Sequence, residues 1–215
     1  SEGLRLAERA GDTDEQWRLR VNECFDPKFW YSERRKAAQA DLPPLRDVAL
    51  QAVTYFEQQQ NWTAMSESLD GCTSIAIYMR NWPEALELAE RRLTIPDLPA
   101  EEWVDVFSSV ALVYFWRGEY TSAISTIQDA LTRLKPGHPV ASLGKLITTL
   151  ASVYFLVGAW DEVVNLLPQL HEIHDLVQYD QYASKRLTEG YVVVLQIALA
   201  REDRAMIDAV STILQ

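Results

Sequence analysis

The sequence predicts an all-α protein built from helical hairpins that repeat and stack, with about eleven or twelve helices. Three observations support this fold class. Apolar residues recur at spacings of three and four, and a fourteen-residue pattern occurs twice, forty residues apart. Only 8 Gly and 9 Pro occur in 215 residues, which is fewer turn residues than a β-sandwich of this length would need.

The repeated pattern is "VALVYFWRGEYTSA" at 110–123 and "LASVYFLVGAWDEV" at 150–163. Each copy carries Ala, then Val-Tyr-Phe, then a Gly that an aromatic residue follows two positions later. Forty residues fit a helical hairpin, and the twenty residues from Trp62 to Trp82 fit one helix and its turn. The spacing therefore predicts hairpins that repeat along the chain.

Helices are expected wherever apolar residues share one face, as Ala85, Leu88 and Ala89 do. Asn61 and Asn81 can cap helix starts through a side-chain oxygen. The expected helices are 2–10, 13–25, 28–40, 44–60, 62–80, 83–94, 100–117, 120–134, 140–157, 160–175, 180–200 and 203–214.

Proline sets several of these boundaries. Pro83, Pro99 and Pro139 lie near helix starts, where a missing N–H costs little. The breaker-rich stretches 94–99 and 135–139 are expected to connect hairpins. Within the helix expected at 160–175, Pro168 predicts a kink or an early break.

The repeated residues resemble the tetratricopeptide repeat (TPR), whose first helix ends with a small residue and a Tyr before a Gly turn. The first copy matches at Ala111, Tyr114, Gly118, Tyr120, Ala123, Ile127, Ala130 and Pro136, and the second at Ala151, Tyr154, Gly158 and Trp160. The resemblance implies one right-handed TPR-like solenoid over 1–215. Residues 100–175 match best, and 1–41, 42–99 and 176–215 are degenerate repeats.

The resemblance also assigns roles to single residues. Gly118 and Gly158 are expected to adopt the left-handed conformation that ends a helix. Tyr120 and Trp160 are expected to fill the gap between successive hairpins. Residues 4–20 are similar to the helix–Gly-Asp–helix units of TPR arrays in large bacterial transcriptional activators and signalling ATPases. This second likeness suggests a fragment of a regulator.

First helices of TPR hairpins line a concave groove, so the resemblance implies candidate binding residues there. They are Asp105, Ser108, Leu112, Phe115, Trp116, Lys145, Thr148, Ser152, Phe155 and Leu156. Three of them are aromatic beyond what the repeat requires, which suits a peptide or a helix as ligand. Alternatively, these aromatics bury against an adjacent helix. The Lys/Asn/Arg clamp of one chaperone-binding TPR subtype is absent.

The formal charge of −11 is uneven, because residues 1–40 are neutral whereas 41–215 hold 23 acidic and 12 basic side chains. Such a surface repels nucleic acid and attracts a cationic peptide, although the acidity can also serve solubility alone. Cys24 and Cys72 form no disulfide framework, so the cytoplasm is the expected compartment. No apolar run reaches membrane-spanning length.

Signals for catalysis are lacking in the sequence. His171 and His174 in "HEIH" could share a metal ion, but a third ligand is not evident and an exposed polar face is the alternative. We find no nucleophile motif, phosphate loop or cofactor fingerprint. The basic stretch 33–38 is either a contact for an anionic partner or a solvated helix face.

The sequence thus predicts a non-enzymatic scaffold that binds a protein or peptide, as part of a signalling or transcriptional regulator. It needs no cofactor. The alternative is a repeat domain that senses a small-molecule effector, since 7 Trp and 9 Tyr allow stacking on sugars. Exposed ends of the array would permit homo-oligomers. The start at Ser1 and the end within a helical pattern suggest a piece of a longer polypeptide, or a processed or tagged one.

Overall fold

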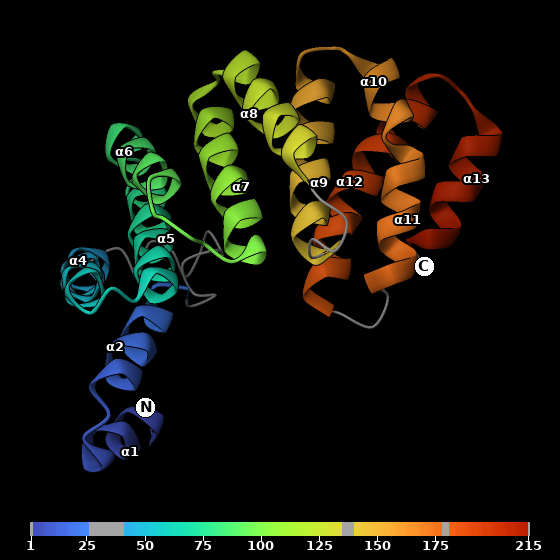
Figure 1. The fold of residues 1–215 in the computed structure, drawn as a ribbon. Coiled ribbons are helices and arrows are strands. Elements are labelled where there is room, and N and C mark those ends of the chain that lie inside the picture. Colours follow the sequence, from blue (N-terminus) through green and yellow to red (C-terminus); the bar gives the residue numbers. More distant parts are fainter. Residues whose placement is uncertain (1, 26–40, 135–139, 178–180, 215) are drawn as a thin grey trace. The chain divides into compact units, whose positions relative to one another are not determined.

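The computed structural model describes residues 2–25, 41–134, 140–177 and 181–214, and these residues form helices without any strand (Figure 1). This confirms the predicted all-α class. The elements are α1 (Glu2–Ala10), α2 (Thr13–Asn22), the 3-10 helix η1 (Glu23–Phe25), α4 (Leu42–Gln58), α5 (Trp62–Tyr78), α6 (Trp82–Leu93), α7 (Ala100–Arg117), α8 (Tyr120–Arg133), α9 (Val140–Leu156), α10 (Trp160–Asn165), α11 (Leu167–Val177), α12 (Gln181–Ala200) and α13 (Arg204–Ile213).

The predicted boundaries agree with these elements to within a few residues, and two differences are informative. The helix expected at 13–25 ends at Asn22 and continues as η1. The helix expected at 160–175 is broken between Asn165 and Leu167, as Pro168 predicted, because proline cannot donate the backbone hydrogen bond that would continue it. The helix expected at 28–40 lies outside the described residues.

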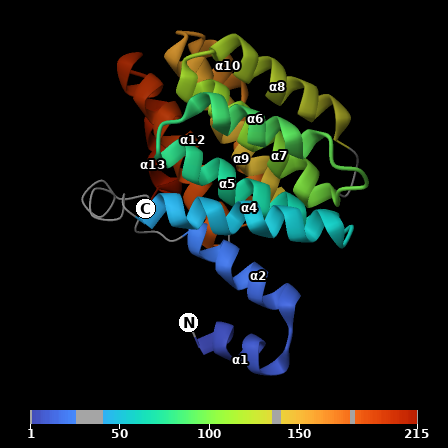
Figure 2. The same ribbon diagram turned by 90° about the vertical axis from the view of Figure 1, so that its left-hand side faces the viewer.

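The chain divides into two compact units, Ser1–Ser109 and Val110–Gln215, so the prediction of one domain stays a prediction. In unit 1, α4, α5 and α6 lie side by side, and α2 packs against α4 and α5 (Figure 2). Ala49, Ala52 and Phe56 of α4 are fully buried, as are Leu69 and Ile75 of α5. These side chains have no polar groups that need hydrogen bonds, so burying them stabilises the packed helices.

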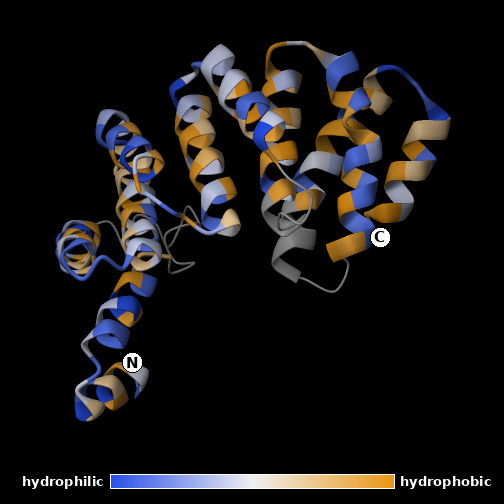
Figure 3. Cartoon of the chain, in the orientation of Figure 1, coloured by the Kyte–Doolittle hydropathy of each residue, from blue (hydrophilic) through white to orange (hydrophobic). Residues whose placement is uncertain are grey.

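In unit 2, α9 packs against α8, α11 and α12, and α13 packs against α12. The core contains the fully buried Leu146 and Leu170. Gly190 lets α12 approach closely, since a Cβ atom there would lie 3.2 Å from Cδ2 of Leu170. By contrast, the connection between α12 and α13 is hydrophilic (Figure 3).

One turn geometry recurs between paired helices. Gly118 and Gly158 have φ of 78° and 77°, which confirms the predicted left-handed conformation. The N–H of the following residue then donates to a carbonyl five residues back, as from Glu119 to Tyr114 at 2.9 Å. This is the Schellman arrangement that closes a helix. The same geometry occurs at Gly11, Gln60, Arg80 and Glu202.

Caps differ from one turn to the next. The side chain of Asn61 accepts a bond from the N–H of Ala64 at 3.3 Å, which confirms the predicted cap. Asn81 is the N-cap residue of α6 as predicted, but its side chain makes no cap hydrogen bond; its amide nitrogen donates to Oε2 of Glu84 at 2.6 Å. A nearby carboxylate is a stronger acceptor for this amide than any neutral group.

Replacing Gly118 by alanine is expected to lower the free energy of unfolding by about 1 kcal/mol, because alanine is strained at positive φ. No atom lies within 4 Å of the Cβ position, so the effect comes from the backbone alone. Glu202→Gly is the matched reverse change and should raise stability by up to about 1 kcal/mol. Urea denaturation measures both changes, and an unaltered midpoint in Gly118→Ala would contradict this account of the turn.

Candidate functional site

The predicted groove residues at the C-terminal ends of α7 and α9 are either exposed or half-buried. The side chains of Trp116 and Leu156 are 54% and 53% exposed. Phe115 and Phe155 are half-buried and contact the aromatic residue that opens the next helix. The Phe115 ring lies 6.2 Å from that of Tyr120, and the Phe155 ring stacks on Trp160 at 6.1 Å. Phe115 and Phe155 therefore pack across the turn of their own hairpin, whereas Trp116 stays exposed.

The aromatic residues that open α8 and α10 and the polar groove residues differ in burial. Tyr120 and Trp160 are half-buried, so the aromatic residues expected to fill a gap still keep a solvent-exposed edge. Of the polar groove residues, Ser108 is fully buried and Thr148 is nearly so. The hydroxyl of Ser108 donates to the carbonyl of Val104 at 3.1 Å. The hydroxyl of such a serine is hydrogen-bonded within its own helix, so it is not available to donate to a ligand.

Leu112, Lys145 and Ser152 are half-buried on α7 and α9. The Ser152 hydroxyl donates to the carbonyl of Thr148 at 3.0 Å. Asp105, the first of the predicted residues, belongs to unit 1. There it lines a cavity that the sequence did not indicate.

This cavity has a volume of about 470 Å³ and lies among α2, η1, α4, α5, α6 and the first turns of α7. Side chains from six elements therefore meet in it, although they are up to ninety positions apart in the sequence. The lining residues are Glu15, Arg18, Val21, Asn22, Phe25, Phe56, Ala64, Glu67, Ser68, Asp70, Arg92, Glu102 and Asp105.

Arg92 of α6 is the buried cation of this cavity, and its side chain is only 1% exposed. Nη1 donates to Oδ1 of Asp70 at 2.5 Å, and Nη2 donates to Oδ2 of Asp105 at 2.9 Å and to Oε2 of Glu102 at 3.3 Å. Burial alone lowers the pKa of Arg92, but the three carboxylates raise it more. The guanidinium therefore stays charged and ties α5, α6 and α7 together.

Two hydroxyl groups complete the coordination of Arg92. Nε donates to Oγ of Ser66 at 3.2 Å, and Nη1 also donates to Oγ of Ser109 at 3.1 Å. The Ser109 hydroxyl donates in turn to Oδ1 of Asp70 at 3.0 Å. A buried charge with this many partners is satisfied, which lowers the cost of its desolvation.

Among the described residues that line the cavity, negative charge is in excess, because five carboxylates face two guanidinium groups. Asp70, Glu102 and Asp105 share Arg92, whereas Glu15 and Glu67 make no ion pair within the part of the chain that the structure describes. The pKa of Glu67 is raised, first by desolvation and then by the charge of Glu102.

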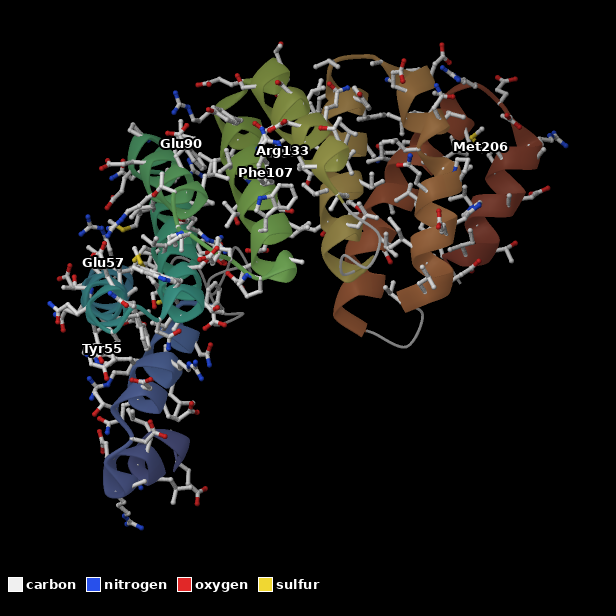
Figure 4. The ribbon with its side chains drawn as sticks, viewed as in Figure 1. Tyr55, Glu57, Glu90, Phe107, Arg133 and Met206 are labelled. Carbon is white, nitrogen blue, oxygen red and sulfur yellow. The ribbon has the colours of Figure 1, made fainter. Side chains whose placement is uncertain are left out.

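Part of the remaining wall is apolar. Val21, Phe56 and Ala64 are buried, and Phe25 is half-buried beside them. Nearby, the hydroxyl of Tyr55 donates to Oδ1 of Asp14 at 2.8 Å and fastens α4 to α2; Figure 4 labels Tyr55. The cavity thus combines a wall that accepts aliphatic groups with carboxylates that accept hydrogen bonds.

The sequence contained a signal for Arg92 that was missed. Arg92 follows Ala85, Leu88 and Ala89 on the face of α6 that is buried. A charged residue at a buried position of an apolar face needs partners elsewhere in the fold. Its partners could not be named without the tertiary structure.

The histidine pair of α11 packs against one tyrosine. The ring of His171 stacks on Tyr191 at 5.7 Å, and His174 meets the same ring edge-on at 5.9 Å. Burial, with a smaller effect of Asp175, raises the pKa of Tyr191 to about 12. Among the described residues, no three His, Cys, Asp or Glu side chains are grouped as metal ligands.

The described helices include none with the length and apolar character that a membrane span requires. Cys24 and Cys72 are free and fully buried, and burial raises the pKa of each thiol to about 12. Both thiols are therefore protonated and unreactive at neutral pH.

No family model matches the chain, and no curated protein matches it. Solved structures do. The chain is similar to the TPR-like repeats of a putative kinesin light chain from Podosopora anserina, with a TM-score of 0.58 and 15% sequence identity over 94% of this chain and 97% of that chain. A second structure, of a substituted form of that protein, matches with the same TM-score and identity and is covered over 96%. The chain therefore has the fold of a TPR-like helical-repeat protein.

Proposed function

We propose that the chain is a non-enzymatic scaffold that binds a protein or peptide segment carrying basic side chains, one of which enters the cavity of unit 1. The observation that carries this proposal is that the described residues around one cavity include five carboxylates and two guanidinium groups. The fold supports it, because helical-repeat proteins commonly bind partners through extended surfaces.

The chemistry of the cavity favours arginine or lysine over other side chains. Both have an aliphatic stem that can lie on the apolar wall of Val21 and Phe56, and a cationic head that the carboxylates attract. Arginine fits better, because its planar guanidinium donates two parallel hydrogen bonds to one carboxylate. Arg92 already binds carboxylates of this cavity, with one hydrogen bond each to Asp70, Glu102 and Asp105.

The predicted groove residues of unit 2 enter the proposal as a second contact. Trp116 and Leu156 occupy equivalent positions of two repeats, each two residues before the turn glycine, and both are exposed. Exposed apolar side chains repeated at one position suit apolar residues of a bound segment. Phe115 and Phe155 would support them from behind.

Reversal of one cavity charge is expected to weaken binding. In Glu67→Lys, a fluorescein-labelled peptide of nine residues rich in arginine should bind at least about tenfold more weakly than to wild type, which corresponds to about 1.4 kcal/mol. Fluorescence anisotropy measures the affinity. Glu87→Lys on the exposed surface of α6 is the matched control for net charge, since Glu87 does not line the cavity.

Equal affinities of the two variants would contradict binding in the cavity. If both lose affinity to the same extent, the peptide responds only to the overall charge of the chain. An acidic peptide of the same length should not bind to either variant or to wild type.

A small-molecule sensor is the second candidate function, and the size of the cavity favours it. About 470 Å³ is within the range of small-ligand sites. The ligand would be a small organic cation with an amidinium or amine group. Thermal unfolding with argininamide or spermidine separates the two functions. Stabilisation by these compounds without any effect of the arginine peptide would favour the sensor.

The wider role follows from weaker observations. The similarity of residues 4–20 to units in bacterial regulators supports a place in a signalling or transcriptional protein. The two free buried thiols suit the reducing cytoplasm. The acidic charge supports a partner other than nucleic acid. Self-association through the ends of the array is a further part of this proposal, and light scattering over a range of concentrations tests it.

A further inference from the structure

We propose that unit 2 binds a basic amphipathic helix of a partner protein in a leucine-lined groove between α8 and α11. The groove has a volume of about 340 Å³. Its apolar wall consists of Leu131 and Leu134 of α8, Leu143 of α9, and Ile173 and Leu176 of α11. The groove belongs to unit 2 alone, so this inference goes beyond the proposed function and does not depend on the cavity of unit 1.

The groove follows from the way in which α9 packs against two neighbours. This helix contacts both α8 and α11. Gly144 of α9 allows the close approach of α11, because a Cβ atom there would lie 3.4 Å from Cγ2 of Ile173. Leu143, the residue before Gly144, lines the groove from α9, while α8 and α11 contribute its two sides.

The apolar side chains of the groove are accessible to a partner. Leu176 is 63% exposed, and Leu131, Leu134 and Leu143 are half-buried. Only Ile173 among the apolar lining residues is buried. An exposed leucine that shares a groove with three half-buried leucines forms the kind of apolar patch that marks an interaction site on a protein surface.

The dimensions of the groove favour a helix as its ligand. Along α11 the lining residues extend from Gln169 to Leu176, which corresponds to about 10 Å of helix. An amphipathic helix covers this distance with apolar side chains at positions i, i+3 or i+4, and i+7. An extended peptide would need free backbone groups to pair with, and the helices α8 and α11 use theirs in their own hydrogen bonds.

The charges beside the groove favour a basic helix over a second copy of this chain. Glu172 lines the groove and Asp175 precedes Leu176; both carboxylates are exposed, and neither forms an ion pair among the described residues. On α8, by contrast, Asp129 pairs with Arg133 at 2.8 Å. Two copies that paired through this face would bring the acidic α11 helices together, whereas lysine or arginine side chains of a partner helix would pair with them.

Fluorescence anisotropy tests the groove with a fluorescein-labelled amphipathic peptide of about fourteen residues, which has leucines on one helical face and lysines on the other. The peptide should bind at least about tenfold more weakly to Leu176→Asn than to wild type, because it loses an apolar contact. Leu199→Asn is the matched control and should bind like wild type, since Leu199 of α12 is 57% exposed and does not line the groove. A peptide of the same composition whose leucines share no face should not bind.

Two outcomes separate this groove from the cavity of unit 1. Loss of binding in Glu67→Lys together with full binding in Leu176→Asn would assign the amphipathic peptide to the cavity, so the inference would fail and the proposed function would stand. Failure of the amphipathic peptide to bind wild type would also overturn the inference, and the arginine-rich peptide tests the proposed function separately.

Two further outcomes concern the groove itself. Equal affinities of wild type and a Leu176→Asn variant with unaltered circular dichroism would show that the peptide binds elsewhere, which overturns the inference. Sedimentation of wild type as a dimer that Leu176→Asn converts to a monomer would show that a second copy, and not a partner helix, occupies the groove.

Discussion

Replacing Arg92 by alanine is expected to destabilise the chain by about 3–5 kcal/mol, because it leaves Asp70, Glu102 and Asp105 close together without their counter-charge. The Arg92 side chain is 1% exposed, so its removal leaves the three carboxylates without a cation that the fold holds in place. Guanidinium or urea denaturation measures the loss. Arg92→Lys should lie between alanine and wild type, since lysine keeps the charge but not the planar fork of donors.

The adjacent Arg91 provides the matched control. Its Nη2 pairs with Oε2 of Glu57 at 3.1 Å, but both side chains are well exposed, at 39% and 50%; Figure 4 labels Glu57. Exposed pairs contribute about 0–1 kcal/mol, so Arg91→Ala should change stability little. A loss in Arg92→Ala no larger than that in Arg91→Ala would contradict the structural role of the buried cluster.

The second large effect is expected at Leu170, whose replacement by alanine should cost about 2–5 kcal/mol. Leu170 is fully buried and contacts α12 at Gly190, where the close approach of the helices leaves little freedom to fill a cavity. Chemical denaturation of unit 2 measures it. Leu176→Ala on the same helix is the control, because Leu176 is 63% exposed and should lose less than about 0.5 kcal/mol. Similar losses for both leucines would contradict the packing described for α11.

Much of the fold could be predicted because its determinants are local. Gly118 and Gly158 end helices through their own backbone freedom, and Pro168 breaks a helix through its own ring. The recurrence of the same pattern forty residues later indicated that these helix ends belong to repeated hairpins. The cap hydrogen bond of Asn81 could not be predicted from its position alone. Its amide group binds the carboxylate of Glu84, three residues later, instead of a backbone N–H.

The candidate site was less predictable because it depends on residues distant in the sequence. The position of Asp105 within the repeat predicted that it contributes to a binding surface. Its partner Arg92 comes from α6 and the neighbouring Glu67 from α5, and neither could be predicted from the repeat. Whether Phe115 would face a groove or its own hairpin could not be decided from spacing. In the structure the half-buried Phe115 ring lies 6.2 Å from the ring of Tyr120, a contact that depends on how α8 packs.

The central claim is that unit 1 receives a basic segment in its acidic cavity. Hydrogen exchange of the chain with and without the arginine-rich peptide, followed by mass spectrometry, tests it most directly. We predict slower amide exchange in α2, in the first half of α5 and in residues 100–109, which carry the lining side chains, and little change in α13. Binding of the peptide with slower exchange elsewhere and none in these three segments would contradict the claim.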